Sequence, residues 1–393
     1  MIGAVATFRN EQHHSLRRKS AGIDLHLILV VAILLAFGLV MVGSASIDIA
    51  DRQTGEPFYY LYRQGGYVAI ALVMALIAYQ VPLAFWERVG PLMLLASLLM
   101  LMVLLIPGVG RNVNGATRWL NLVVFNLQVS ELAKLSVVIY LAGYLVRRSE
   151  AVRTTVGGFI KPMGLIAVVV LLLLLEPDFG ASVVIIATAM GMMFLGGVQL
   201  WLFGGLLLVA LLSFAALAIS SPYRLERLTT FLNPWADPFN SGFQLTQSLI
   251  AIGRGEWFGV GLGGSVQKLF YLPEAHTDFV FAVLAEELGL VGGAVVILLF
   301  AYLVWRTFMI GRRAAVEGNG FAAYLAFGIG LWVALQVFIN IGVNAGLLPT
   351  KGLTLPLMSY GGSSMMVMCI AMAIVLRIDA EHRRGASVAG KEA

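Results

Sequence analysis

Three polar clusters interrupt the long apolar stretches of this chain, and their side chains are the ones that could do chemistry. In the first cluster, Arg118 is followed after a short apolar stretch by Glu131 and Lys134. Glu131 and Lys134 are three residues apart, so they share a helix face, and the apolar neighbours of Lys134 place its ammonium inside the protein. Arg118 and Lys134 together predict a cationic site for an anionic group. The alternative is a structural Glu–Lys pair that holds two helices together.

The second cluster ends with a carboxylate, Asp278, where a polar loop meets a long apolar segment. An Asp at such a boundary can simply cap the N-terminus of the helix that follows. Thr277 could do that instead and leave Asp278 free to act. Next to hydrophobic walls the pKa of a carboxyl group rises toward values that suit a general base. Helix cap and catalytic base are therefore the two interpretations of Asp278.

The third cluster, residues 348–364, contains two prolines and three glycines, which stop a regular helix. Irregular backbone at membrane depth is tolerated only where it is buried in protein or lines a water-filled cavity. We therefore expect a re-entrant segment that helps to form a cavity, with Lys351, Ser359 and Tyr360 as hydrogen-bond donors. An ordinary external loop is the alternative.

The composition shows what kind of fold must position these clusters. Of the 393 residues, 60% are hydrophobic and 12% are charged, and the mean hydropathy is +0.90. Soluble domains contain about 45–50% apolar and about 25% charged residues, so a soluble globular protein, a disordered chain and a disulfide scaffold are excluded. The long continuous apolar runs indicate helices rather than a β-barrel. The predicted fold class is an all-α polytopic membrane protein.

Ten apolar segments are candidates for membrane-spanning helices, which need about 20 residues each. These segments are residues 24–47, 65–81, 88–106, 128–146, 162–175, 179–197, 199–220, 278–305, 321–343 and 359–377. An even number puts the Arg clusters on one side of the membrane, and the positive-inside rule makes that side, with both termini, cytoplasmic. Membrane orientation thus explains the basic residues, and the net charge of +5 does not indicate a nucleic-acid partner.

The chain has no low-complexity linker, so we expect one membrane domain, residues 24–378, between cytoplasmic tails at 1–23 and 379–393. A large external loop, residues 221–277, separates the seventh and eighth predicted helices. Within this loop, residues 242–253 have the pattern of an amphipathic helix, and the glycines that follow permit a tight backbone. The alternative is that the loop is only a packed external cap.

These clusters carry a resemblance to a known family. The chain resembles the bacterial SEDS proteins, named for shape, elongation, division and sporulation, from the first predicted helix to about Arg377. The motifs that carry the resemblance are NGATRW at 114–119, SELAK at 130–134, PDFG at 177–180, NPWADP at 233–238, GLGGSVQK at 261–268, LPEAHTDF at 272–279, EELG at 286–289 and LPLMSYGGSS at 355–364. The stretch PTKGLTLP at 349–356 is similar to that of the division-type members. The chain departs from the family at Val129, where Pro is common, and at Glu176, where Gln or another polar residue is common.

The resemblance implies a peptidoglycan glycosyltransferase that polymerises lipid II at the outer face of the bacterial inner membrane, for septal wall synthesis in the division-type members. The essential aspartate of the family falls on Asp278. The family's functional basic residues fall on Arg118 and Lys134, and Glu131 accompanies them. Lys351 matches the division-type motif. We expect these basic residues, Glu131 and the hydroxyl of Ser359 to bind the substrate.

The expected reaction joins a sugar hydroxyl to the anomeric carbon of a second sugar, and lipid pyrophosphate leaves. Asp278 would take the hydroxyl proton as general base. Glycoside hydrolases use a second carboxylic acid to protonate the leaving group, but a pyrophosphate leaves as an anion, so cations can replace that acid. One-step displacement predicts inversion at the anomeric carbon. The chain has no dedicated metal-ligand spacing, and a divalent cation, Mg²⁺ or Mn²⁺, could assist.

The partners that the resemblance implies are lipid II, the lipid bilayer, a class B penicillin-binding transpeptidase and regulatory membrane proteins of the division complex. The rival function is a lipid II flippase or transporter. A transport site lies near the bilayer midplane, whereas the residues singled out above lie at external junctions of loop and helix. A scaffold that only recruits division proteins would leave Lys134 and Asp278 without a purpose.

Overall fold

The structure, a computed structural model, is helical apart from one small sheet within the residues that it describes. Those residues are 23–113, 116–121, 126–219, 231–240, 242–269, 272–349 and 352–389. The long helices are α2 (Leu25–Thr54), α3 (Tyr59–Gln80), α4 (Leu83–Leu104), α5 (Val129–Arg147), α7 (Val156–Leu175), α8 (Phe179–Leu195), α9 (Leu200–Ile219), α12 (Val280–Val316), α13 (Gly320–Asn344) and α14 (Gly362–Ala389). Shorter helices are α6 (Ser149–Thr154), α11 (Phe243–Arg254) and the 3₁₀ turn η1 (Pro234–Ala236).

Each apolar segment predicted from the sequence overlaps one of these long helices, so the helical polytopic fold class is confirmed. Within the described chain, eight helices are long and apolar enough to cross a membrane, and α8 and α9 count as shorter apolar helices. The number of ten membrane crossings and the boundaries of the domain therefore stay predictions.

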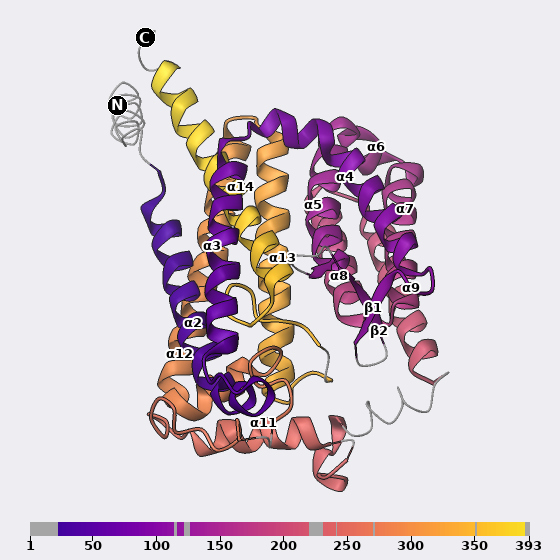
Figure 1. The fold of residues 1–393 in the computed structure, drawn as a ribbon. Coiled ribbons are helices and arrows are strands. Elements are labelled where there is room, and N and C mark those ends of the chain that lie inside the picture. The colour runs from indigo at the N-terminus through magenta and orange to yellow at the C-terminus, as the bar shows by residue number, and fades with distance from the viewer. Residues whose placement is uncertain are drawn as a thin grey trace, which may run out of the picture.

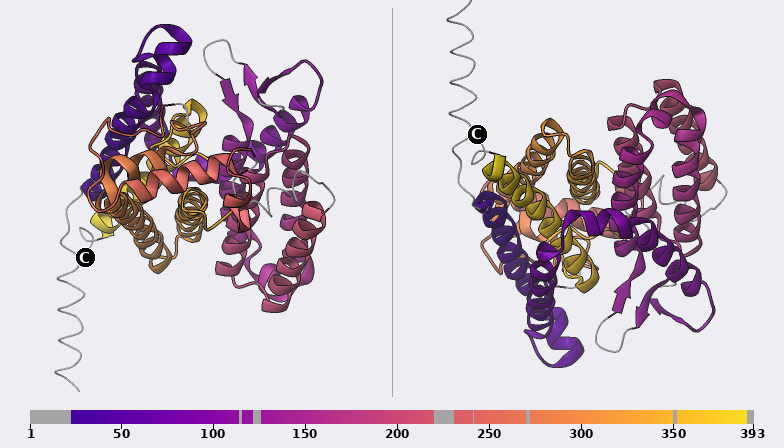
Figure 2. Two further views of the ribbon diagram at one scale, coloured as in Figure 1. Left: turned by 90° about the horizontal axis from the view of Figure 1, so that it is seen from below. Right: turned by 90° about the horizontal axis from the view of Figure 1, so that it is seen from above.

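Helix α13 joins two groups of helices. One group contains α2, α3, α12 and α14, and the other contains α4, α5, α7 and α8; α13 packs against α12 on one side and against α5 and α8 on the other (Figures 1 and 2). Helix α11 lies across the end of the bundle, roughly perpendicular to the long helices (Figure 1). The elements that carry the polar clusters meet around α13.

The segment between α4 and α5 forms a small antiparallel sheet, which the sequence analysis did not predict. Its strands are β1 (Gly110–Val113), β2 (Ala116–Asn121) and β3 (Asn126–Gln128), in the order β1-β2-β3. In its register Trp119 lies opposite Gln128. The sequence signal was the Asn-Gly pair between β1 and β2, which is a strong hairpin indicator; the pair itself lies outside the described residues. The sheet places Arg118 on β2.

Helix α12 is broken at Gly289, whose φ of 67° and ψ of −167° are not helical. A Cβ at this position would lie 2.4 Å from the amide nitrogen of Gly259 and 2.6 Å from that of Phe258. Only glycine permits both the conformation and this close approach of a second backbone. The break separates a short piece of α12, which follows Asp278, from the long piece that continues to Val316.

Candidate active site

Two asparagines of α13 hold the main chain at Asp278. The side-chain amides of Asn340 and Asn344 each donate a hydrogen bond to the carbonyl oxygen of Asp278 over 3.0 Å. Asn344 also accepts from the amide of Ala282 over 3.1 Å, so it caps the start of α12. Asp278 lies one residue before the N-cap position, which Phe279 occupies. The helix-cap interpretation of Asp278 is therefore wrong, because a residue from another helix satisfies the amide that needed a cap.

Thr277, the other predicted cap, is also engaged elsewhere. Its hydroxyl donates to the carbonyl oxygen of Glu274 over 3.1 Å and to the Oε2 atom of the same residue over 2.7 Å. On the opposite side of this loop, the amide of Tyr360 donates to the carbonyl oxygen of His276 over 2.9 Å. The loop that carries Asp278 is thus fastened by α13 and by the segment after residue 352.

The Asp278 carboxyl group is half-buried in an acidic surrounding. Burial raises its pKa to about 7, and the negative charges of Glu274 and Asp178 add to this rise, while the positive charge of Arg118 opposes it. A Cβ built on Gly352 would lie 3.0 Å from Oδ2 of Asp278, so the backbone of Gly352 closes one side of the carboxyl group. A carboxyl group with this pKa can act as a base near neutral pH.

Arg118 reaches from β2 to the turn between α7 and α8. Its guanidinium donates to the carbonyl oxygens of Glu176, over 3.3 Å, and Pro177, over 2.6 Å. The carboxyl groups of this turn, Glu176 and Asp178, are buried, and each has one oxygen atom without a hydrogen-bond partner. Burial raises the pKa of Glu176 to about 8, the charge of Asp178 adds to the rise, and Arg118 opposes it. Arg118 is therefore a positive charge that acts on both Glu176 and Asp278.

The turn between α7 and α8 contacts the same segment that closes over Asp278. A Cβ on Gly180 would lie 2.7 Å from Cγ of Leu353 and 3.2 Å from the carbonyl oxygen of Gly352. The amide of Asn340 donates to the carbonyl oxygen of Leu353 over 2.5 Å. Arg118, the acidic turn, the 352–353 segment and Asp278 therefore surround one site.

Lys134 lies in the interior, where its charge is compensated. Its ammonium donates to Glu131 Oε1 and to Gln336 Oε1, both over 2.8 Å, and lies 5.4 Å from the ring centroid of Trp332. Glu131 and Lys134 share a helix face, as predicted, and both are buried. Gln336 then donates to the carbonyl oxygen of Thr354 over 3.0 Å. The pair thus connects α5 to α13, as expected of a structural Glu–Lys pair that holds two helices together. Through Gln336 it also contacts the third cluster.

Residues 352–361 of the third cluster form irregular backbone, as predicted, and most of them are buried or half-buried, which disfavours an ordinary external loop. Residues 355–359 are buried without regular structure, and a Cβ on Gly38 of α2 would lie 2.6 Å from the Cα atom of Met358. Ser359 is buried, and its Oγ accepts a hydrogen bond from the amide of Leu355 over 2.8 Å. As an acceptor this hydroxyl closes a turn of the segment, and its role as a donor to substrate stays a prediction. Lys351 lies outside the described residues.

The residues that sequence reasoning missed form one stripe on α13. Gln336, Asn340 and Asn344 follow Trp332 at intervals of four, so their side chains lie above one another on the helix. This stripe contacts Lys134 at one end and Asp278 at the other. The signal was available as three amides at fixed spacing in an apolar helix, where polar side chains are expensive and usually functional.

Within the described ranges, no group of three or more His, Cys, Asp or Glu side chains is arranged to hold a metal ion. In the turn that Arg118 contacts, Glu176 Oε1 and Asp178 Oδ2 are buried oxygens without a hydrogen-bond partner among the described residues.

Comparison with known proteins identifies the class to which this fold and site belong. The family model of the FtsW, RodA and SpoVE cell cycle proteins matches residues 25–384. The chain is therefore a member of this family of polytopic membrane proteins, and its resemblance to the SEDS proteins is confirmed.

Its curated relatives include proteins named probable peptidoglycan glycosyltransferase FtsW. The one from Thioalkalivibrio sulfidiphilus is 60% identical over 93% of this chain and 91% of its own length. The one from Nitrosococcus halophilus is 61% identical over 92% of this chain and 93% of its own length.

Solved structures share the fold. One, described as structural coordination of polymerization and crosslinking by a peptidoglycan synthase complex, has a TM-score of 0.76 and 32% identity, and covers 92% of this chain and 98% of its own. Thermus thermophilus rod shape determining protein RodA has a TM-score of 0.68 and 28% identity, with the same coverage of both chains.

Proposed function

We propose that this chain is a peptidoglycan glycosyltransferase that polymerises lipid II into glycan strands for septal wall synthesis in cell division. The family membership and the names of the curated relatives support the activity. The observation that carries the proposal is Asp278, whose half-buried carboxyl group has a pKa of about 7 and whose main-chain carbonyl is held by two asparagines at the end of an apolar bundle.

In the proposed reaction Asp278 is the general base. The 4-hydroxyl of the acceptor sugar forms a bond to the anomeric carbon of the donor sugar, and its proton passes to the Asp278 carboxylate. The bond from the anomeric carbon to the diphosphate oxygen breaks, and its electron pair leaves with the lipid diphosphate. Because the hydroxyl attacks opposite the leaving group, the anomeric configuration is inverted.

The leaving diphosphate needs positive charge where its own charge develops. Arg118 is the proposed residue for this role, because its guanidinium acts electrostatically on Asp278 and is fixed by two carbonyl oxygens. Lys351, which directly precedes Gly352 in the sequence and matches the division-type motif, is a second proposed cation. Glu131, Lys134 and Ser359 are proposed to contribute to substrate binding. Glu131 and Lys134, both buried on α5, would contribute indirectly, because Lys134 bonds Gln336 and Gln336 bonds Thr354.

A divalent cation, Mg²⁺ or Mn²⁺, is compatible with the residues around Arg118. Mg²⁺ commonly binds one or two carboxylates together with the phosphates of a substrate. Asp178, which has a buried oxygen without a hydrogen-bond partner, and Asp278 would be the protein ligands. When bound, such an ion would neutralise charge on the diphosphate. Polymerisation that persists in excess EDTA would exclude this role.

The rival function is transport of the lipid-linked sugar across the membrane. Asp278 precedes α12, whose opposite end carries Arg306, Arg312 and Arg313. By the positive-inside rule these arginines are cytoplasmic, so Asp278 belongs to the external end and not to the midplane position of a transport site. Polymerisation therefore agrees better with the location of the carboxylate.

The proposed setting is the bacterial inner membrane at the division septum, with both termini cytoplasmic. A class B penicillin-binding transpeptidase and regulatory membrane proteins of the division complex are the proposed partners. The similar solved structure described as a peptidoglycan synthase complex supports an assembly of this kind.

The test is lipid II polymerisation by the purified protein with its transpeptidase partner. Asp278→Asn keeps the size of the side chain and removes the base, so glycan chains should disappear, with a loss of at least about 10² in rate. The variant should still fold, which its thermal unfolding curve would check. Glycan synthesis at the rate of the unsubstituted protein would reject Asp278 as base, and lipid II movement across vesicles without polymer would favour the transporter.

A further inference from the structure

The segment that follows α11 is joined to α12 through the backbone. The amides of Leu290 and Val291 donate to the carbonyl oxygens of Glu256, over 2.8 Å, and Trp257, over 3.1 Å. In return, the amides of Val260 and Gly261 donate to the carbonyl oxygens of residues 286 and 287, over 3.0 and 3.1 Å. These bonds pair the backbone amides and carbonyls of α12 that lose their helical partners at the break. Residues 256–261 therefore lie at the same height along α12 as Gly289.

Two buried carboxylates of α12 fasten the same region. Glu286 accepts from Arg254 over 2.8 Å and from Ser265 over 2.5 Å. Glu287 accepts from Ser44 of α2 over 2.7 Å and from Lys268 over 3.0 Å. The segment that follows α11 is therefore fixed at a defined height along both α2 and α12.

That height can be derived from polar pairs at the two ends of these helices. Asp24 and Arg306 form an ion pair of 2.7 Å at the predicted cytoplasmic end, and Ser44 meets Glu287 at the external end. Ser44 follows Asp24 by 20 residues, and Arg306 follows Glu287 by 19 residues. At 1.5 Å per residue each length is about 30 Å, the thickness of the hydrocarbon core. The break at Gly289 then lies about 3 Å inside the outer edge of that core.

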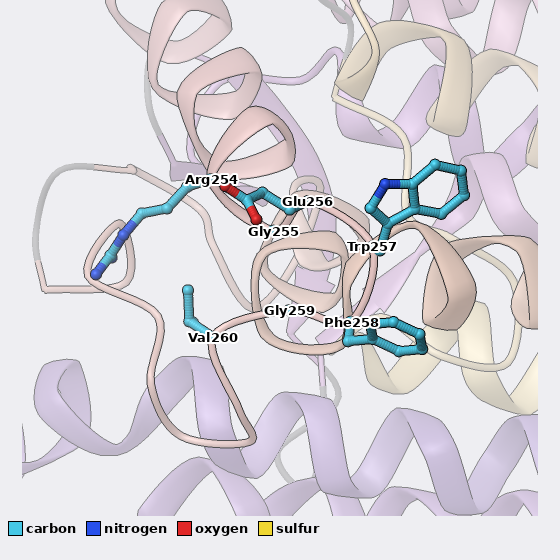
Figure 3. Close-up of a pocket in the computed structure, with 7 residues that line it drawn as sticks. All are labelled: Arg254, Gly255, Glu256, Trp257, Phe258, Gly259 and Val260. Atoms are coloured by element: carbon cyan, nitrogen blue, oxygen red, sulfur yellow. The ribbon is translucent and has the colours of Figure 1, made fainter.

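The side chains at this height are aromatic and exposed. Trp257 is 67% exposed and Phe258 is 81% exposed, and Leu290 next to them on α12 is 58% exposed. Around the shallow pocket formed by residues 254–260, the two aromatic rings lie on one side of the loop and the Arg254 side chain lies on the other (Figure 3). The aromatic side continues the exposed apolar surface of α12.

We propose that Trp257 and Phe258 insert into the outer leaflet of the lipid bilayer and anchor the external end of α12 at the boundary between headgroups and hydrocarbon. Trp side chains are enriched at this boundary. Irregular backbone is tolerated at this depth because its polar groups are hydrogen-bonded to α12. Lipid is the occupant that the derived height and the continuity with the exposed face of α12 favour over water or a second protein surface.

The test measures the depth of position 258 in phospholipid nanodiscs of phosphatidylethanolamine and phosphatidylglycerol. The chain has a single cysteine, Cys369, which is buried and would be replaced by Ala. A nitroxide is then attached through Phe258→Cys, and its collisions with oxygen and with a water-soluble nickel chelate are compared. Leu298→Cys, on the exposed face of α12, is the lipid control, and Asp51→Cys, seven residues beyond Ser44, is the aqueous control.

The expected result is collision with oxygen several times more effective than at Asp51→Cys, and collision with the nickel chelate several times weaker. A nickel response equal to that of Asp51→Cys would overturn the proposal, because the loop would then be in water. Protection from both reagents would also overturn it, because a protein surface would then cover the rings. The measurement requires no enzymatic activity, so it is independent of the proposed function.

Discussion

Asn340 connects Asp278 to Leu353 through one side-chain amide. It donates to the carbonyl oxygen of Asp278 over 3.0 Å and to that of Leu353 over 2.5 Å. The two carbonyls belong to the proposed base and to the segment that closes over it, and they are 75 residues apart in the sequence. The position of the proposed base relative to the segment that covers it is therefore set by Asn340, which lies on α13 and belongs to neither.

Replacing Asn340 by Ala should slow catalysis more than it weakens substrate binding. One lost hydrogen bond that positions a reacting group corresponds to about 1 kcal/mol, so two bonds correspond to a decrease in kcat of at least about tenfold. KM for lipid II should change less than kcat. Steady-state polymerisation kinetics would measure both values.

Asn319→Ala is the matched control at the opposite end of α13. Asn319 caps this helix by accepting from the amide of Ala322 over 3.1 Å, and loss of such a cap costs about 1 kcal/mol of stability. Its Tm should fall while kcat stays the same. If Asn340→Ala lowers Tm as the control does and leaves kcat unchanged, Asn340 has only a structural role.

The pH dependence of kcat/KM should show the ionisation of Asp278. A base must be deprotonated, so kcat/KM should rise as pH increases through about 7 and level off above it. Glu274→Gln removes a negative charge that raises the pKa of Asp278, so the rise should move to lower pH. Arg118→Gln removes a positive charge that lowers this pKa, so the rise should move to higher pH.

The two variants are a sign test, measured as rate profiles from pH 5 to 9. Displacement of both profiles in the same direction, or of neither, would contradict the assignment of the rise to Asp278. Arg118→Gln should also lower the maximal rate, because Arg118 is the proposed stabiliser of the diphosphate.

The sequence was sufficient for the long helices because each is a long apolar stretch with short polar connections. It was also sufficient for residues 352–361, where Pro and Gly predict irregular backbone and apolar residues favour burial. The strands around Arg118 were missed although the Asn-Gly pair is a strong hairpin indicator, because the strands themselves are only four, six and three residues long.

Contacts between distant residues were beyond the sequence. Asn344 caps α12 from 62 residues away, and Arg118 binds carbonyl oxygens near residue 176. Such pairs depend on how helices pack, which local pattern does not encode. The general-base interpretation of Asp278 followed from its position where a polar loop meets an apolar helix, and the resemblance to a known family added the proposed substrate. The acidic turn around Asp178 needed the structure.

Lys134 can be tested as a substrate ligand or as a structural residue by a double substitution. Lys134→Met alone leaves the buried Glu131 carboxylate without its partner, which should cost about 3–5 kcal/mol of stability. Adding Glu131→Gln removes the orphaned charge and should restore most of that stability. Thermal unfolding of the single and double variants would measure this recovery.

The activity of the double variant separates the two roles. If Lys134 only joins α5 to α13 through Gln336, stability and polymerisation should recover together. If its charge also attracts the diphosphate, KM for lipid II should stay raised, by about tenfold for each 1.4 kcal/mol lost, although the fold is restored. Recovery of stability with normal KM would remove Lys134 from the list of proposed binding residues.

Glu176→Gln should stabilise the protein at alkaline pH and not at acidic pH. The folded-state pKa of Glu176, about 8, is above its ordinary value of 4.5 because of burial and the charge of Asp178. The folded state therefore holds this proton more tightly than the unfolded state, so the stability that the protonated group contributes is lost as pH rises from about 4.5 through 8. Gln keeps the shape of the side chain and has no proton to lose.

The expected result is a Tm at least about 2 °C higher than that of the unsubstituted protein at pH 9, with little difference at pH 4. Polymerisation should continue, because Arg118 binds the carbonyl oxygen of residue 176 and not its side chain. Glu56→Gln, in the exposed turn between α2 and α3, is the control and should change Tm at neither pH. A Glu176→Gln variant that is less stable than the unsubstituted protein at pH 9 would mean that the ionised carboxylate has a partner in the folded state, as a bound cation at the acidic turn would provide.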